Sequence, residues 1–270
     1  MPTRDHALPV ANIRSPGEVT LSVWKALFLR EAATRLASGR AAWMWLLFEP
    51  VAEIAVLMVV FTVIRGRSYP GVDFALFLAI GVIGFAAFRN AAMRSIDAIS
   101  SNAALFAYRQ VKPVDTVIVR AVLEGVLLCL VAAILMGCSS LIGLDVLPHN
   151  PVNVAISLTV LWALGTGFGL VLSVGAELVP EIGKVARIVM TPIYFLSGVL
   201  FSPQALPPSL RDWLLLNPLM HGIEFAREAF FPSYPPLTGI SILYPAACAL
   251  LALLLGLALH VRFTRRLVEL

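Results

Sequence analysis

Three acidic residues in this sequence stand inside long apolar segments, where a charge is costly. Glu49 and Glu53 lie one helical turn apart in one segment, and Glu124 interrupts another. An ionisable side chain at membrane depth is rare and is by default a candidate for function. Two interpretations stay open: the carboxylates contact a transported solute, or they pair with arginines inside the protein. The arginines within reach are Arg89, Arg94 and Arg120.

Sequence motifs for catalysis and nucleotide binding are missing from the chain. The run GTGFG at 165–169 has leucine where a dinucleotide fingerprint needs its last glycine, and no G-x-x-x-x-G-K-[ST] loop occurs. Gly165 and Gly169 instead form a G-x-x-x-G pair, which lets two membrane helices approach closely. The three cysteines and four histidines lack metal-ligand spacing. We therefore predict no catalytic, cofactor or metal site, and any ATP and Mg²⁺ must be bound by a partner.

The composition is that of an integral membrane protein. The mean hydropathy is +0.89 and only 13% of the residues are charged, against about 25% in a soluble domain. Six segments are long and apolar enough to cross about 30 Å of hydrocarbon. We expect an all-α fold with spans at residues 41–64, 72–90, 114–143, 152–176, 186–202 and 239–261.

Positive charge is distributed unequally between alternate connections. Fifteen Lys and Arg residues fall in 1–40, 89–113, 177–187 and the C-terminal tail, and four fall on the other side. The positive-inside rule therefore places both termini in the cytoplasm. The N-terminal region lacks the apolar core and cleavage site of a signal peptide, so we expect it to be retained. Because orientation accounts for the net charge of +4, no nucleic-acid partner is needed.

Residues 1–40 form a cytoplasmic N-terminal region ahead of a membrane domain at 41–270. Its apolar residues recur at helical spacing, so that Trp24 and Phe28 share one face while Arg30 lies opposite and Arg35 at the margin. Such a helix lies in the membrane interface, with its tryptophan at headgroup depth and its basic groups towards anionic lipid. It is either a plain anchor or an anchor that also docks a partner.

The connection at 89–113 is longer than two neighbouring spans require. It has helical character, with Ile96 and Ile99 on one side and Arg94, Asp97 and Ser101 on another. The Lys-Pro pair at 112–113 then ends this helical stretch, because the residue before proline avoids the helical backbone conformation. A short amphipathic helix tied to two spans could pass force from a soluble partner into the membrane. The alternative is a loop without such a role.

Aromatic side chains recur inside the predicted spans. Each one alone is more often packed or lipid-facing, but as a set they would suit a sugar, whose apolar ring face stacks on aromatic rings. The candidate channel residues, with the two acidic residues of the first span, are Trp45, Phe48, Glu49, Glu53, Phe85, Phe88, Tyr194, Phe195 and Phe201.

The segment at 201–239 is rich in proline and charge and cannot itself cross a bilayer. It divides into two half-length helices, which suit a re-entrant pair on the outer side between the last two spans. Glu224 and Arg227 have the spacing of an ion pair on one helix. We interpret the segment as a candidate periplasmic gate, with Trp213, His221, Glu224, Arg227 and Glu228 as its residues.

Five stretches occur in order along the chain: LFLREAATRL, WMWLLFEP, LFAYRQVKPVDT, PEIGKVARIVMTPIYFLSGVLF and NPLMHGIEFAREAFFP. Together they resemble the membrane subunit of the group 2 capsular polysaccharide ABC exporters, the KpsM type of ABC-2 permease. The resemblance runs from about residue 19 to near the C-terminus.

This resemblance implies a bacterial inner-membrane homodimer with two copies of a separate ATPase, exporting a lipid-linked acidic polysaccharide to the periplasm. A periplasmic co-polymerase and an outer-membrane exporter are implied as further partners. By position, the interface helix would contain Trp24, Phe28, Arg30, Glu31 and Arg35. The ATPase contacts would include Arg94, Asp97, Tyr108, Arg109, Glu181 and Lys184.

Two rival functions remain open at this point. A related permease could carry another solute, such as O-antigen, teichoic acid or a drug, with the same topology. A membrane-embedded transferase or phosphatase would require a cluster of reactive side chains that the sequence does not offer.

Overall fold

The computed structural model describes residues 15–37, 51–56, 72–141 and 143–269, with isolated positions 44, 48 and 60. In these ranges the regular elements are helices. The long helices are α1 (Pro16–Ala37), α3 (Phe74–Ser95), α4 (Pro113–Leu141), α5 (Pro151–Leu178), α6 (Pro180–Leu196) and α9 (Leu243–Val268). The shorter ones are α7 (Pro208–Leu214), α8 (Pro218–Phe230) and the 3₁₀ helices η1 (Ser100–Ala107) and η2 (Pro203–Ala205).

Proline and capping side chains decide where the helices begin. Each helix from α4 to α8 starts with a proline, whose missing N–H costs nothing in the first turn. Asp73 accepts hydrogen bonds from the second and third main-chain N–H groups of α3, and Asn150 and Asn217 cap α5 and α8 in the same way. These residues fix the ends of helices whose interiors are apolar.

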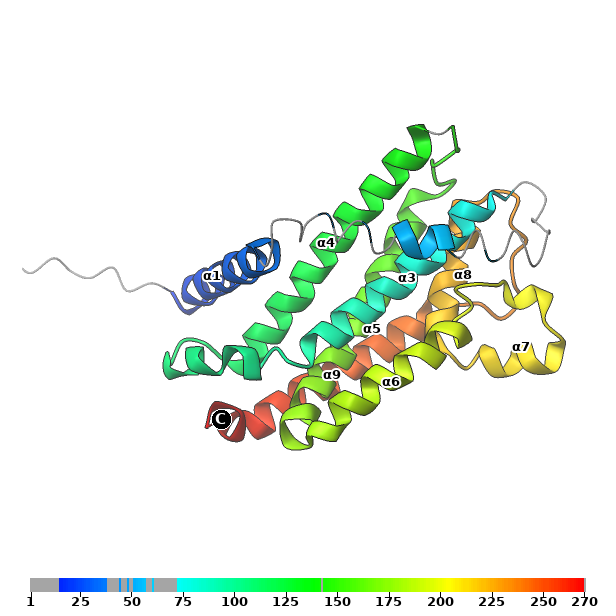
Figure 1. Ribbon diagram of the computed structural model, residues 1–270. Coiled ribbons are helices and arrows are strands. Elements are labelled where there is room, and N and C mark those ends of the chain that lie inside the picture. The colour runs from blue at the N-terminus through cyan, green and yellow to red at the C-terminus, as the bar shows by residue number, and fades with distance from the viewer. Residues whose placement is uncertain are drawn as a thin grey trace, which may run out of the picture.

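Helix α5 lies at the centre of the bundle and packs against α9, α3, α8, α6 and α4 (Figure 1). The G-x-x-x-G pair makes the contact with α3, as predicted. A Cβ added at Gly165 would lie 2.8 Å from Phe88 Cα, and one at Gly169 would lie 2.7 Å from Ser95 Cβ. The two backbones therefore approach closely because the side chains are missing.

The opposite ends of the bundle differ in character. At one end lie η1, the α5–α6 turn and the C-terminus of α9, and at the other lie α7 and α8 (Figure 1). Helix α1 lies alongside the half of α4 that is nearer to η1. This arrangement separates the predicted ATPase contacts from the predicted gate.

Four described helices are long and apolar enough to cross a membrane: α3, α4, α5 and α9. They correspond to the predicted spans at 72–90, 114–143, 152–176 and 239–261. The span predicted at 41–64 lies mostly outside the described residues. The predicted number of six spans is therefore not confirmed.

The fifth predicted span, 186–202, is displaced. Helix α6 starts at Pro180 and ends at Leu196, so it is 17 residues long. The chain turns directly afterwards, where Gly198 has a φ of +69°. Glycine reaches this left-handed conformation without steric cost, and it commonly follows the end of a helix. Phe201 consequently lies in the turn beyond the helix.

Candidate functional site

Helix α1 is held against its neighbours by polar side chains. The Trp24 indole Nε1 donates to Asp115 Oδ1 at 2.9 Å, and Arg30 Nη2 donates to Asn102 Oδ1 at 2.9 Å. Phe28 is half-buried on the same helix. The predicted headgroup depth of Trp24 stays a prediction, and the structure adds that the indole N–H bonds to a carboxylate in the first turn of α4.

Two ion pairs continue this contact along α4. Arg120 Nε lies 2.7 Å from Glu31 Oε1, and Arg35 pairs with Glu124. The second pair supports the interpretation that Glu124 is neutralised within the protein, although its partner Arg35 was not among the predicted arginines. A basic group expected to face lipid thus neutralises a carboxylate that is only 4% exposed.

The connection after α3 has the two faces that the sequence predicts. Ile96 and Ile99 are buried, while Arg94, Asp97 and Ser101 are exposed. It is not one helix, however: α3 continues to residue 95, a turn follows, and η1 completes the connection. We call residues 96–112 the coupling segment.

Two contacts attach the coupling segment to the adjoining ends of α5 and α6. Arg187 Nη2 lies 2.5 Å from Asp97 Oδ2, and the main-chain N–H of Ser100 donates to Glu177 Oε1 at 2.9 Å. The predicted first and second ATPase contacts therefore lie at the same end of the bundle. The remaining predicted contact residues are all exposed there: Tyr108, Arg109, Glu181 and Lys184.

Aromatic rings form a continuous row through the bundle. Phe168 of α5 contacts Phe88, Phe88 contacts Phe85 on α3, and Phe85 contacts Tyr194 of α6, with centroid separations of 5.5, 6.3 and 5.0 Å. Tyr194 then meets Phe195 at 5.6 Å. The row thus links three helices, and its end at Phe195 is 51% exposed.

One end of this row lines a pocket between α3 and α6. Four predicted channel residues meet there: Glu53, Phe85, Tyr194 and Phe195. Sequence reasoning did not assign Arg89 and Arg187 to this pocket, whose other lining residues are Met93, Met190 and Thr191. The pocket therefore combines aromatic faces with two guanidinium groups and one carboxylate, and the guanidinium of Arg187 is also paired with Asp97.

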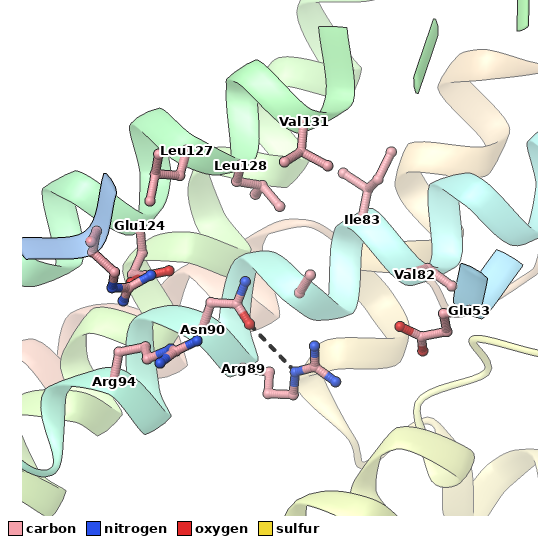
Figure 2. A pocket seen from close by; sticks show the side chains of 12 residues that line it. Glu53, Val82, Ile83, Arg89, Asn90, Arg94, Glu124, Leu127, Leu128 and Val131 are labelled. Carbon is pink, nitrogen blue, oxygen red and sulfur yellow. Dashed lines mark hydrogen bonds and ion pairs between the residues drawn. The ribbon is translucent and has the colours of Figure 1, made fainter. Parts of the chain in front are cut away.

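A second pocket, between α3 and α4, shares Glu53 and Arg89 with the first. Figure 2 shows Glu124 and Arg94 towards one end, Arg89 and Asn90 in the middle, and Glu53 towards the other end. Arg89 Nε donates to Asn90 Oδ1 at 3.4 Å. The opposite wall is apolar and consists of Leu127, Leu128 and Val131 of α4.

Other candidate channel residues are not brought into these pockets. Trp45 and Glu49 lie outside the described residues, and Phe48 is 55% exposed. Phe88 is buried between helices and takes part in the row without lining either pocket. Phe201 belongs to the turn after α6, where its carbonyl oxygen accepts a hydrogen bond from Arg227.

Arg227 of α8 is completely buried and binds the turn that follows α6. Its Nη1 donates to Gly198 O and to Glu224 Oε1, both at 2.7 Å, and its Nη2 donates to Val199 O at 2.6 Å. The guanidinium carbon lies 3.6 Å from the centroid of the Phe77 ring on α3. The predicted Glu224–Arg227 pair is present, but it lies in the interior.

The carboxylate of this pair has a second partner. The Tyr234 hydroxyl lies 2.7 Å from Glu224 Oε2 and 2.6 Å from Ser202 Oγ. Desolvation raises the pKa of the Glu224 carboxyl, and the positive charge of Arg227 opposes that rise. Burial also raises the pKa of the Tyr234 hydroxyl, which therefore keeps its proton as a donor. Together these groups hold α8 to the end of α6.

The other predicted gate residues divide between the interior and the surface. His221 is buried: its Nε2–H donates to Leu215 O at 2.7 Å, and its Nδ1 accepts from the Ser241 N–H at 3.1 Å. Trp213 is 74% exposed on α7, and Glu228 is exposed on α8. Three of the five residues therefore act as internal ties between segments.

The residues that sequence reasoning missed follow a detectable pattern. Arg89 lies four residues after Phe85 on α3, and Arg187 lies seven before Tyr194 on α6. Both spacings place the arginine and the aromatic residue on one helical face. Asp115 gave a weaker signal, because an acidic residue in the first turn of a helix is commonplace.

Comparison with known proteins places this arrangement in a family. The model of the family described as "ABC-2 type transporter" matches residues 22–231. The match includes α3 to α8 and most of α1, and with them both pockets and the Arg227 ties.

Several curated proteins are similar over almost the whole chain. The polysialic acid transport protein KpsM of Escherichia coli is 37% identical over 247 residues, covering 92% of this chain and 95% of that protein. The capsule polysaccharide export inner-membrane protein CtrC of Neisseria meningitidis serogroup B is 28% identical, covering 89% and 90%. BexB of Haemophilus influenzae, named likewise, is 26% identical, covering 90% and 91%.

Proposed function

Because this chain belongs to the ABC-2 type transporter family, we propose that it is the permease subunit of an ATP-driven exporter of lipid-linked capsular polysaccharide. The polymer moves from cytoplasm to periplasm across the bacterial inner membrane. The relatives named above are a polysialic acid transport protein and capsule polysaccharide export proteins of the inner membrane. Their similarity extends over about nine tenths of the chain.

The observation that carries the substrate class is the pocket between α3 and α6. Phe85, Tyr194 and Phe195 offer ring faces. The same lining has two guanidinium groups against one carboxylate, that of Glu53, and the half-exposed Arg187 is shared with Asp97 at the surface. Sugar rings stack on aromatic faces, and guanidinium groups pair with carboxylates. This combination suits an acidic polysaccharide. Each contact is weak, so the polymer can slide from one to the next.

Energy comes from a separate ATPase, because the sequence contains no nucleotide-binding loop. Two copies of that ATPase bind a homodimer of this chain and hold the ATP and Mg²⁺, and the permease has no catalytic site of its own. The main contact is the exposed side of the coupling segment, with Asp97, Tyr108 and Arg109, together with Arg94 at the end of α3. Glu181 and Lys184 of α6 add a smaller one.

The orientation follows from the charge of the two bundle ends. The end formed by η1, the α5–α6 turn and the C-terminus of α9 faces the cytoplasm, and α7 and α8 face the periplasm. There α8 serves as a gate element for the exit of the polymer. A co-polymerase and an outer-membrane exporter would receive it on that side.

Deletion of the gene tests this proposal. We expect surface polysaccharide to disappear and polymer to accumulate in the cytoplasm, with both effects reversed by the wild-type gene. Arg89→Gln should restore export poorly, whereas Arg211→Gln on α7, which removes the same charge outside the pocket, should restore it fully. Normal surface polysaccharide in the deletion strain would overturn the proposal. A changed lipopolysaccharide profile or drug susceptibility instead would identify another substrate.

A further inference from the structure

We propose that Asp115 is the joint through which movement of the coupling segment reaches both α1 and α4. Asp115 is a positioning residue: it touches neither pocket and acts by connecting three elements. The inference rests on the proposed function, because it assigns a role to Asp115 in coupling ATP hydrolysis to export.

Both carboxylate oxygens of Asp115 are occupied by partners from different elements. Oδ1 accepts the indole N–H of Trp24 on α1 at 2.9 Å, and Oδ2 accepts the main-chain N–H of Lys112 at 3.0 Å. Lys112 ends the coupling segment, and Asp115 itself is the third residue of α4. The side chain is 7% exposed, so water does not compete strongly for these bonds.

A capping role alone explains only half of this geometry. An acidic residue at the third helical position often accepts from the N–H that precedes the helix, and the helix dipole favours its negative charge there. Such a cap needs one oxygen. The second oxygen is used to hold α1, and this bond joins residues that are 91 positions apart in the sequence.

Further contacts link the coupling segment, α1 and α4 in pairs. Arg30 of α1 donates to Asn102 Oδ1 of η1, within the coupling segment, and Arg120 of α4 pairs with Glu31 of α1. Each pair of elements among the coupling segment, α1 and α4 is therefore bonded directly. A displacement of one of these three elements then moves the other two, provided that the hydrogen bonds of Asp115 stay intact.

Two substitutions remove hydrogen bonds of Asp115 selectively. Trp24→Phe keeps an aromatic ring but removes the N–H, so that only the bond to α1 is lost. Asp115→Asn has one acceptor oxygen in place of two, so that one of the two bonds is lost. Ser22→Ala on the exposed side of α1 is the matched control, because the Ser22 hydroxyl bonds only within its own helix in the described structure.

The first measurement is the amount of polymer exported per ATP hydrolysed by the complete complex with its ATPase. We expect ATPase activity to stay within about twofold of wild type while export per ATP falls about tenfold in Asp115→Asn, the factor that corresponds to 1.4 kcal/mol. Export per ATP should also fall in Trp24→Phe, and in the double variant it should fall at least as far as in Asp115→Asn. Equal losses of ATPase and export, or unchanged export per ATP, would overturn the proposal.

The second measurement does not depend on the substrate. Spin labels at Leu29 on α1 and Ile156 on α5, both exposed, report the distance between these helices after the three cysteines are replaced. ATP with vanadate should change this distance in wild type and in the Ser22→Ala control, and change it at least twofold less in Asp115→Asn. An equal change of the distance in Asp115→Asn, or no change in wild type, would refute the proposed role of Asp115 as the connecting residue. Failure of wild type to place acidic polymer on the cell surface would instead refute the proposed function.

Discussion

Replacement of Arg227 by methionine should destabilise the protein severely. The variant keeps an unbranched chain but removes every hydrogen bond of the guanidinium, which is 0% exposed. Glu224, which is 2% exposed, then loses its counter-charge. Breaking a buried ion pair from one side costs about 3–5 kcal/mol. The carbonyl oxygens of Gly198 and Val199 also lose their donors, so the upper part of this range is expected.

This cost is a large part of the stability of a typical protein, about 5–15 kcal/mol. For a chain of this size, 1 kcal/mol corresponds to about 2–4 °C in Tm, so a cost of about 4–5 kcal/mol lowers Tm by about 8–20 °C. Thermal unfolding of the detergent-purified protein measures it. Glu228→Gln, an exposed change on the same helix, is the control and should shift stability by less than about 0.5 kcal/mol.

A double-mutant cycle tests the reasoning directly. Glu224→Gln combined with Arg227→Met removes both charges, so the double variant should be more stable than Arg227→Met alone. Two results would refute the argument. One is an Arg227→Met protein that unfolds within about 2 °C of wild type, which corresponds to less than about 1 kcal/mol. The other is a pair of single changes whose effects simply add.

Two further changes probe the packing and the coupling segment. Gly165→Ala should destabilise by about 1–3 kcal/mol, because the new Cβ meets the backbone of Phe88, which cannot rotate aside; unchanged thermal unfolding would contradict this. Asp97→Asn removes an exposed pair with Arg187, so stability should change by less than about 1 kcal/mol while surface polysaccharide decreases. Normal capsule staining in that strain would contradict the assigned role of Asp97 in ATPase coupling.

Local rules predicted the helices well where the signals lie close together in the sequence. The spans predicted at 114–143 and 152–176 begin next to Pro113 and Pro151, where α4 and α5 start, and proline suits this position because its fixed φ and missing N–H fit the first turn. The contact through Gly165 was also predictable, since a residue without a side chain has little other use on an apolar face. Helical periodicity alone predicted which residues between 94 and 101 are buried and which are exposed.

Long-range partners could not be predicted in this way. Glu124 pairs with Arg35, 89 positions away, although several arginines stand closer in the sequence, and nothing local favours one of them. The burial of Arg227 was missed for a different reason. Helical periodicity predicts that the charged face of α8 points to the protein surface. The turn after α6, however, leaves main-chain carbonyl oxygens that need hydrogen-bond donors from the protein interior. The position of this face depends on where α6 ends, which no local pattern fixed.

The bonds between α1 and α4 have a consequence for biosynthesis. Residues 24 and 115 are 91 positions apart, and a ribosome adds about 5–20 residues per second, so roughly 5–20 s pass before the second partner is made. The bonds that hold α1 against α4 can therefore form only after the start of α4 has been made, so α1 reaches its final position later than its place in the chain suggests.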